Sequence, residues 1–313
     1  MATSGAAARI ELGLVLPFHV PPGDLPEVAR IADEGGIDSI WVTDRTITPG
    51  HIPWYEPLSL LGTLAGITHR IRIGTSVLVP ARLNPVITAH SLATAQEVSG
   101  GRVIAGFGVG GLEPKDFELC GTDVNQRGEI TDEWIPLMRR LWTEDSVSVT
   151  GKHYQCENAY IPIRPNPAPP IWIGGGTPPA MSRAARLGDG WLSIFVPPEA
   201  FPGAWASVQE QAVAAGRDPS AITPAAYVFS AIGGTDQEAE TKLGPHVQNL
   251  MGAPLEAVSA GCLWGSPATW VERLTAYAEA GVAAINFVLF SDDLVKDTRL
   301  LTEEVVPRLR PTR

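Results

Sequence analysis

Apolar segments that read as strands alternate eight times along this chain with segments that read as helices. The predicted strands cover 10–16, 37–43, 71–77, 102–107, 170–174, 190–195, 225–232 and 283–290. The predicted helices cover 24–34, 56–68, 85–98, a stretch near 129–141, 178–187, 199–215, 267–280 and 293–306. Because the strand segments are continuously apolar, we expect a parallel sheet that is covered on both faces. Eight strand–helix units in about 250 core residues predict an α/β fold, a closed (β/α)8 TIM barrel.

Two segments depart from this alternation. Residues 146–163 alternate apolar and polar side chains around Gly151, which predicts an inserted β-hairpin. Residues 236–260 predict a helical excursion near the C-terminal third of the chain. We expect residues 1–8 to form a disordered tail and residues 9–313 to form a single domain.

Charge and cysteine content limit the partners and the location. The formal net charge of the 313 residues is −11 and Lys and Arg form no cluster, so we expect neither nucleic acid nor a membrane surface as a partner. The longest apolar stretches are far too short to span a bilayer. Three cysteines, Cys120, Cys156 and Cys262, lie far apart without metal-ligand spacing, which favours a reducing cytoplasm. The histidines show no ligand spacing either, so no metal site is expected.

A glycine run follows the fifth predicted strand. Gly174, Gly175 and Gly176 end the apolar segment, and Thr177 stands at the N-cap position of a helix that begins with two prolines. Such a helix offers free backbone N–H groups and the positive end of its dipole to an anion. The glycines let the backbone approach that anion closely. The run therefore predicts a site for a phosphate-bearing cofactor, with a tight turn that binds nothing as the alternative.

Four motifs in order resemble the bacterial luciferase-like monooxygenase family, in the branch that uses the deazaflavin coenzyme F420. They occupy 36–44, 73–77 with Asn84-Pro85, 99–102 with 106–110, and 170–191. The resemblance extends from about Leu12 to Val306. It implies a barrel whose active site lies at the C-terminal ends of the strands. It also implies hydride transfer between F420 and a small or medium organic substrate, and a homodimer.

The resemblance implies particular roles for residues in these motifs. Ser76-Val77 resembles the family's non-prolyl cis peptide, a bulge beneath the flavin ring, with an ordinary trans strand end as the alternative. Asp44 resembles the residue that hydrogen-bonds the deazaflavin near its ring, with a loop cap as the alternative. Val109 and Gly110 resemble backbone contacts with the cofactor, and residues 174–177 resemble its phosphate cradle.

Two positions depart from the family pattern. Arg45 stands where many deazaflavin-using relatives have His, and Gly111 stands where the family's sugar-phosphate dehydrogenases have an acid. Both positions handle protons in that subfamily, so a sugar-phosphate dehydrogenase with the same acid and base is disfavoured. Arg45 stays charged and is no general base. We expect it to stabilise an anionic ring or a substrate carboxylate, or to be a solvated loop arginine.

Loop position predicts the remaining site residues. His19 and His51 are the nearest candidates for a proton donor, with structural or surface roles as the alternative. Phe18, Trp54 and Trp191 are predicted to wall a substrate pocket, although isolated aromatic residues are equally often core.

Other functions compete with F420 chemistry. Residues 106–111 match the G-x-G-x-x-G dinucleotide motif, but they follow the fourth predicted strand and open no clean apolar helix. The missing His and acid favour a non-catalytic flavin-binding barrel, whereas the phosphate cradle argues against it. The principal alternative is an FMN-dependent monooxygenase that receives reduced flavin from a partner reductase. The sequence of residues 74–78 and the presence of Asp44 favour F420 as the cofactor. A separate reductase or dehydrogenase would recycle it.

Overall fold

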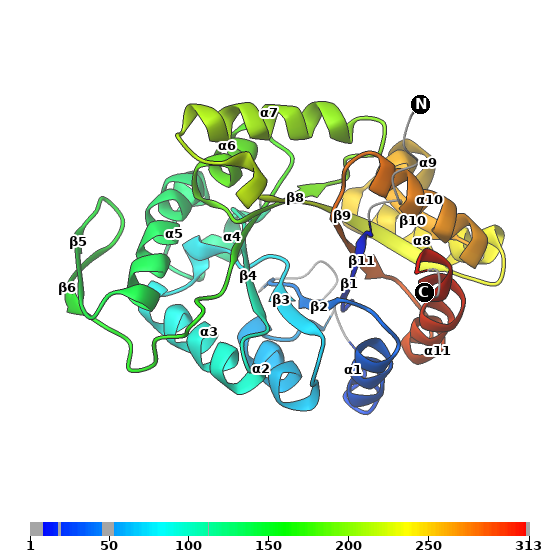
Figure 1. Ribbon diagram of the computed structural model, residues 1–313, viewed down its shortest axis with the longest axis horizontal. Helices are drawn as coiled ribbons and strands as arrows, with labels where there is room; N and C mark the ends of the chain where they lie inside the picture. Colours follow the sequence, from blue (N-terminus) through cyan, green and yellow to red (C-terminus); the bar gives the residue numbers. More distant parts are fainter. Residues whose placement is uncertain (1–8, 18–19, 46–52, 112, 311–313) are drawn as a thin grey trace, which may run out of the picture.

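The strands close into a barrel in the computed structural model, which describes residues 9–17, 20–45, 53–111 and 113–310. Within these residues, parallel strands pair in the order β9-β11-β1-β2-β3-β4-β7-β8, and β8 pairs with β9 to complete the ring. Their bounds are β1 Glu11–Val15, β2 Ser39–Val42, β3 Arg72–Thr75, β4 Val103–Phe107, β7 Ile171–Gly174, β8 Gly190–Ile194, β9 Thr223–Ile232 and β11 Ala284–Leu289. The predicted (β/α)8 barrel is confirmed (Figure 1).

Helices connect the strands and surround them, as the alternation predicts (Figure 1). They are α1 Leu25–Glu34, α2 Pro57–Ile67, α3 Pro85–Ser99, α4 Pro114–Glu118, α5 Arg127–Thr143, α6 Pro178–Leu187, α7 Phe201–Ala214, α10 Pro267–Glu279, α11 Leu294–Leu300 and α12 Val306–Leu309. The helix predicted over 293–306 is α11 followed by a π-helical turn, and α12 extends it to Leu309. The short helix α4 is not among the predicted helices.

The inserted hairpin is also confirmed. It consists of β5 (Val147–Thr150) and β6 (Gln155–Ala159), which pair antiparallel at the outer edge of the molecule beyond α5 (Figure 1). The Glu133 carboxylate of α5 accepts hydrogen bonds from the backbone N–H groups of Lys152, His153 and Tyr154. These bonds fix the turn of the hairpin against the barrel's helical layer.

The C-terminal excursion contains a strand that the sequence does not predict. Helices α8 (Asp236–Met251) and α9 (Leu255–Val258) precede β10 (Cys262–Gly265), which pairs parallel with Phe229–Ile232 of β9. On the same edge of β9, β8 ends at Ile194 opposite Tyr227. The last third of β9 is therefore open for β10 to pair.

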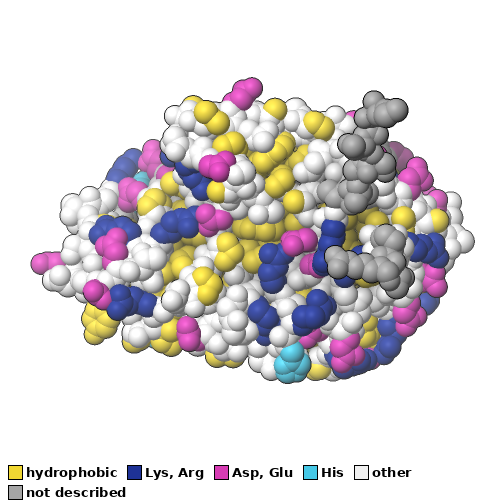
Figure 2. All heavy atoms as spheres, viewed as in Figure 1, with side chains coloured by type: hydrophobic (Ala, Val, Ile, Leu, Met, Phe, Trp, Pro, Cys, Tyr) yellow, Lys and Arg dark blue, Asp and Glu magenta, His cyan; other side chains and the backbone are white. Residues whose placement is uncertain are grey.

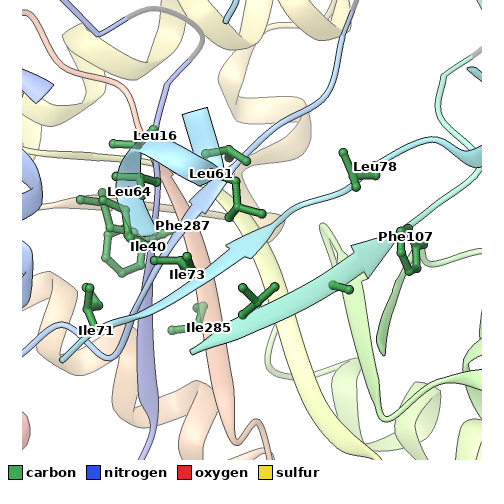
Figure 3. Close-up of a cluster of buried hydrophobic side chains, with 14 of the residues drawn as sticks. Leu16, Ile40, Leu61, Leu64, Ile71, Ile73, Leu78, Phe107, Ile285 and Phe287 are labelled. Atoms are coloured by element: carbon green, nitrogen blue, oxygen red, sulfur yellow. The ribbon is translucent and has the colours of Figure 1, made fainter. Parts of the chain in front are cut away.

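Side chains alternate between the barrel interior and the helical layer. The rings of Trp41 on β2 and Trp172 on β7 lie 5.2 Å apart between centroids, although these strands do not pair, so both point into the interior. The opposite faces of the strands pack on the helices. Figure 3 shows part of this layer, in which Leu61 and Leu64 of α2 lie near Ile40, Ile73 and Phe287 of the strands and near Leu16, which directly follows β1.

Candidate active site

A cleft of about 640 Å³ opens at the C-terminal ends of the barrel strands. Segments that follow β2, β3, β4 and β7 line it, together with β8, β9 and the end of α8. Apolar side chains gather in the middle of the face shown in Figure 2, below α6 and α7. Most site residues predicted from the sequence line the cleft: Asp44, Arg45, Trp54, Ser76, Val77, Val109, Gly110, Gly174, Gly175, Gly176 and Thr177.

The glycine run turns the chain from β7 into α6. Gly175 has φ +134, and a Cβ there would lie 2.6 Å from the Cβ of Ala180. Thr177 is the N-cap of α6, as predicted, but its hydroxyl makes no capping hydrogen bond. In the described part of the chain, the N–H groups of Gly176 and Thr177 also donate to no protein acceptor. The residues thus present unused donors at a helix N-terminus, which is the donor set that a phosphate requires.

Trp191 does not wall the cleft, contrary to the prediction. It is fully buried on the outer face of β8, where its ring stacks on Phe201 and Trp205 of α7. Its neighbour Leu192 faces the cleft instead, because successive side chains of a strand point to opposite faces. The Trp191 indole N–H donates to the Gly175 carbonyl oxygen at 2.9 Å. Trp191 therefore supports the glycine run from behind.

The peptide bond between Ser76 and Val77 is cis, as the family resemblance implies. The Val77 side chain projects between two glycines, because a Cβ on Gly108 would lie 2.6 Å, and one on Gly174 2.9 Å, from its methyl carbons. The bulge after β3 thus contacts both the loop after β4 and the start of the glycine run. The Ser76 Oγ is buried at the cleft without a hydrogen-bond partner among the described residues. A ligand with a polar ring edge would satisfy it.

Asp44 is tied to Arg82, which the sequence does not single out. The Asp44 Oδ2 accepts a hydrogen bond from the Val79 N–H at 2.9 Å and lies 3.0 Å from the Arg82 guanidinium. Arg82 also pairs with Asp116 of α4 at 3.2 Å. Burial raises the pKa of Asp44 more than Arg82 and the Val79 N–H lower it. No hydrogen bond within the described residues reaches the Asp44 Oδ1, which leaves one oxygen for a ligand.

Arg45 and Trp54 lie together at the cleft. The Arg45 guanidinium carbon is 5.9 Å from the centroid of the Trp54 ring, a cation–π distance. The Trp54 indole N–H donates to the Thr43 carbonyl oxygen at 3.2 Å. Trp54 therefore stands in the cleft, as predicted, and it holds a positive charge beside Asp44.

Several predictions fall elsewhere. Phe18, His19 and His51 lie outside the described residues. Among the described residues that line the cleft there is no histidine. Gly111 lines the cleft directly after Gly110, so no acid stands at that position. The structure also brings in residues that the sequence does not indicate. They include two acids, Glu113 and Asp116, together with Val79, Arg82, Ala180, Leu192, Ile194, Phe195, Tyr227, Phe229, Leu250 and Met251.

Neither a metal cluster nor a membrane span is found where the chain is described. His, Cys, Asp and Glu residues there form no group of three that could hold a metal ion. None of the described helices has the length and hydropathy needed to cross a bilayer.

Comparisons with known proteins agree with this geometry. The model of the luciferase-like monooxygenase family matches residues 10–284. An F420-dependent glucose-6-phosphate dehydrogenase of Amycolatopsis mediterranei is 38% identical over 179 residues, which are 55% of this chain and 53% of that protein. A protein of the same name from Beutenbergia cavernae is 27% identical over 315 residues, 92% and 94% of the two chains. At identities of 33–38%, the chain spans about half the length of the curated relatives it matches.

A solved structure has the same fold. An F420-dependent secondary alcohol dehydrogenase in complex with an F420–acetone adduct superposes with a TM-score of 0.86 over 96% of this chain and 99% of the other. The two sequences are 21% identical, so the likeness concerns the architecture.

Proposed function

This chain belongs to the luciferase-like monooxygenase family, and we propose that it is an F420-dependent oxidoreductase that transfers hydride between the deazaflavin and a small or medium organic substrate. One observation carries the proposal. The unused N–H groups of Gly176 and Thr177 adjoin the cis bulge, because Val77 packs against Gly174. A cofactor with a phosphate and a flat ring would bridge these two features.

The residues present fit such a cofactor. Gly176 and Thr177 would hold its phosphate, and Val77, Val109 and Gly110 would contact its ring. When bound, the deazaflavin supplies a ring carbon that accepts or donates hydride. The Ser76 hydroxyl would donate to the polar edge of the ring, since it has no partner among the described residues.

Asp44 and Arg45 would set the charge around the ring. The Asp44 Oδ1 would accept a hydrogen bond from the ring edge, while Arg82 holds the other oxygen. Arg45 would stabilise negative charge on the ring or on a substrate, since it is always protonated. Both residues follow β2, so they approach the ring from the same side.

The names of the relatives favour F420 over FMN. The Amycolatopsis and Beutenbergia proteins are F420-dependent dehydrogenases by name, and the second aligns along nearly its whole length. Because the same cradle would serve an FMN phosphate, an FMN monooxygenase fed by a partner reductase is an outcome of the test below.

The proposal includes a location and partners. The three cysteines are free thiols in the described structure, which supports a reducing cytoplasm. A separate reductase or dehydrogenase would recycle F420. A second copy of the chain would cover Ile87 and Val98 of α3, which are 65% and 60% exposed. They are eleven residues apart, about three helical turns, so they lie on one face of the helix.

Titration of the purified protein with F420 and with FMN, followed by cofactor fluorescence, tests the proposal. We expect saturable F420 binding in the micromolar range. Micromolar FMN binding without a response to F420 would contradict it and favour the monooxygenase. Binding of neither cofactor would favour a non-catalytic barrel.

Two variants test the cradle. Gly175→Asp places charge and bulk against the phosphate, but it also strains the backbone, since Gly175 has a positive φ. Thr177→Glu is therefore a second variant, at an exposed residue whose φ of −83 suits any side chain. Gly203→Asp is the matched control, because a Cβ at this α7 position meets nothing within 4 Å. Both cradle variants should lose F420 affinity at least tenfold. If folded Thr177→Glu binds F420 like Gly203→Asp, the phosphate lies elsewhere.

A further inference from the structure

One part of the cleft takes no part in the proposed cofactor contacts. Those contacts follow β2, β3, β4 and β7, whereas β8 and β9 are the next strands around the barrel. Six side chains line this part and form what we call the apolar wall: Leu192, Ile194, Phe195, Phe229, Leu250 and Met251. The last two come from the C-terminal end of α8, within the excursion that distinguishes this chain from a minimal barrel.

Aromatic contacts hold the wall in place. The rings of Phe195 and Phe229 meet edge to face with centroids 4.8 Å apart. Phe229 meets Phe290 in the same way at 5.3 Å. Phe195 has φ +53, a left-handed conformation that a side chain rarely adopts, and the backbone of Gly261 packs closely against it. Such a conformation persists only where its surroundings enforce it, and it often marks a ligand site.

The wall carries no cation. The cations that line the cleft in the described structure are Arg45 and Arg82, which follow β2 and β3. Arg82 already pairs with Asp44 and Asp116. A phosphate group against the wall would lose its hydration and gain no charged partner, which is costly. A phosphorylated sugar therefore does not suit this side of the cleft.

Tyr227 supplies one polar group beside the wall. It lies two residues before Phe229 on β9, so both side chains face the cleft, and it is in register with Ile194 of β8. Its hydroxyl makes no hydrogen bond within the described part of the chain. Burial raises the pKa of Tyr227, so the hydroxyl keeps its proton at neutral pH and can donate it in a hydrogen bond.

We infer that the apolar wall binds the hydrocarbon part of an uncharged ketone or alcohol, and that the Tyr227 hydroxyl donates a hydrogen bond to its oxygen. This inference rests on the proposed function for the place of the cofactor. It goes beyond that function in naming the substrate class, and it separates this chain from the sugar-phosphate specificity in the names of its relatives.

Binding of a series of 2-alkanones, from 2-butanone to 2-octanone, tests the wall without turnover. Isothermal titration uses protein saturated with F420, whose binding is first verified by fluorescence, and glucose 6-phosphate is the comparison ligand. Affinity should rise about three- to fourfold per added methylene until the cleft is filled. Saturable binding of glucose 6-phosphate, or an alkanone affinity that does not depend on chain length, would overturn the inference. Failure of F420 itself to bind would instead contradict the proposed function.

Variants of the wall locate the binding. Phe229→Ala should weaken 2-octanone binding at least tenfold. Met251→Ser is a second variant at the more exposed edge of the wall, where the substitution does not disturb the packing of β9. Tyr160→Ala, on an exposed residue beyond β6, is the control and should bind like wild type. If folded Phe229→Ala or Met251→Ser retains wild-type affinity, the hydrocarbon does not lie against this wall.

Tyr227→Phe tests the hydrogen bond. It should weaken 2-octanone binding about fivefold, the net value of one neutral hydrogen bond, and leave the binding of octane unchanged. Tyr160→Phe is the matched control on an exposed tyrosine. Equal affinity of wild type and Tyr227→Phe for 2-octanone would refute the role of this hydroxyl.

Discussion

The Trp191 indole N–H donates a hydrogen bond to the carbonyl oxygen of Gly175, 2.9 Å away on the neighbouring strand's end. This bond joins the helical layer, where Trp191 stacks on Phe201, to the turn that presents the proposed phosphate donors. The Gly175 N–H also donates to the Leu192 carbonyl oxygen at 3.0 Å, so residues of β8 bind both backbone polar groups of this glycine.

Trp191→Phe should keep most of the stacking but remove the bond. We expect a loss of about 1–3 kcal/mol in the free energy of unfolding, because a partly buried carbonyl loses its donor, and a severalfold weaker F420 affinity. Urea unfolding and fluorescence titration measure these two effects. Trp205→Phe is the control, since Trp205 stacks on the same ring. Equal losses of F420 affinity in the two variants would mean that the bond does not order the turn.

Gly108→Ala should force Val77 aside. A Cβ there would lie 2.6 Å from a Val77 methyl carbon, whereas a Cβ at Gly111 meets nothing within 4 Å. Overpacking predicts a loss of about 1–3 kcal/mol in unfolding free energy and weaker cofactor binding for Gly108→Ala. Gly111→Ala, the control, should remain within about 0.5 kcal/mol of wild type. Wild-type behaviour of Gly108→Ala in both assays would show that the bulge adapts to added volume.

Two buried carboxylates should give pH dependences of opposite sign. Burial raises the pKa of Asp44 despite Arg82, so the stability of wild type relative to Asp44→Asn should fall as pH rises above about 4. Burial also acts to raise the pKa of Asp33, but the N–H groups of His69, Arg70 and Ile71 outweigh it and lower that pKa. Relative to Asp33→Asn, wild type should therefore lose stability as pH falls below about 4.

Urea unfolding of the three proteins between pH 3 and pH 7 checks both slopes. Each slope is read as a difference from wild type at the same pH, so titration of the other carboxylates cancels. A parallel pH dependence of Asp44→Asn and Asp33→Asn would mean that the two environments are alike.

Ile87→Asp should dissociate the proposed dimer. The side chain is exposed on α3, so a charge there leaves the monomer intact but is unfavourable in an apolar interface. Sedimentation equilibrium should give a dimer for wild type and a monomer for the variant. Val213→Asp, on an exposed residue of α7, is the control. A monomeric wild type, or a variant that stays dimeric, would contradict the proposal.

The barrel could be predicted from sequence because its strands are continuously apolar and because glycine follows several of its helices, such as α1, α3 and α6. Because such a strand is apolar along its length, the sequence does not indicate which side chains face the barrel interior and which face the helices. On β8, Trp191 and Leu192 are both apolar and both buried, so nothing in the sequence says that Leu192 faces the cleft and Trp191 the helices. The apolar wall escaped prediction for this reason.

Long-range contacts were also beyond the sequence. Arg82 pairs with Asp44 across 38 positions, and no spacing rule connects them. The strand β10 has only four residues and lies between two helices, so its pairing depends on the open edge of β9. Local signals were sufficient to predict the turn at the glycine run, because the strand end, the three glycines and the two prolines are neighbours in the sequence.

The two prolines that begin α6 have a consequence for ionic strength. They carry no N–H groups, and no lysine or arginine adjoins residues 174–177 among the described residues that line the cleft. A phosphate would therefore be held there by neutral main-chain dipoles at short range, with little contribution from screened attraction between full charges. The contribution of the phosphate to cofactor affinity should consequently change little between low and high salt concentration.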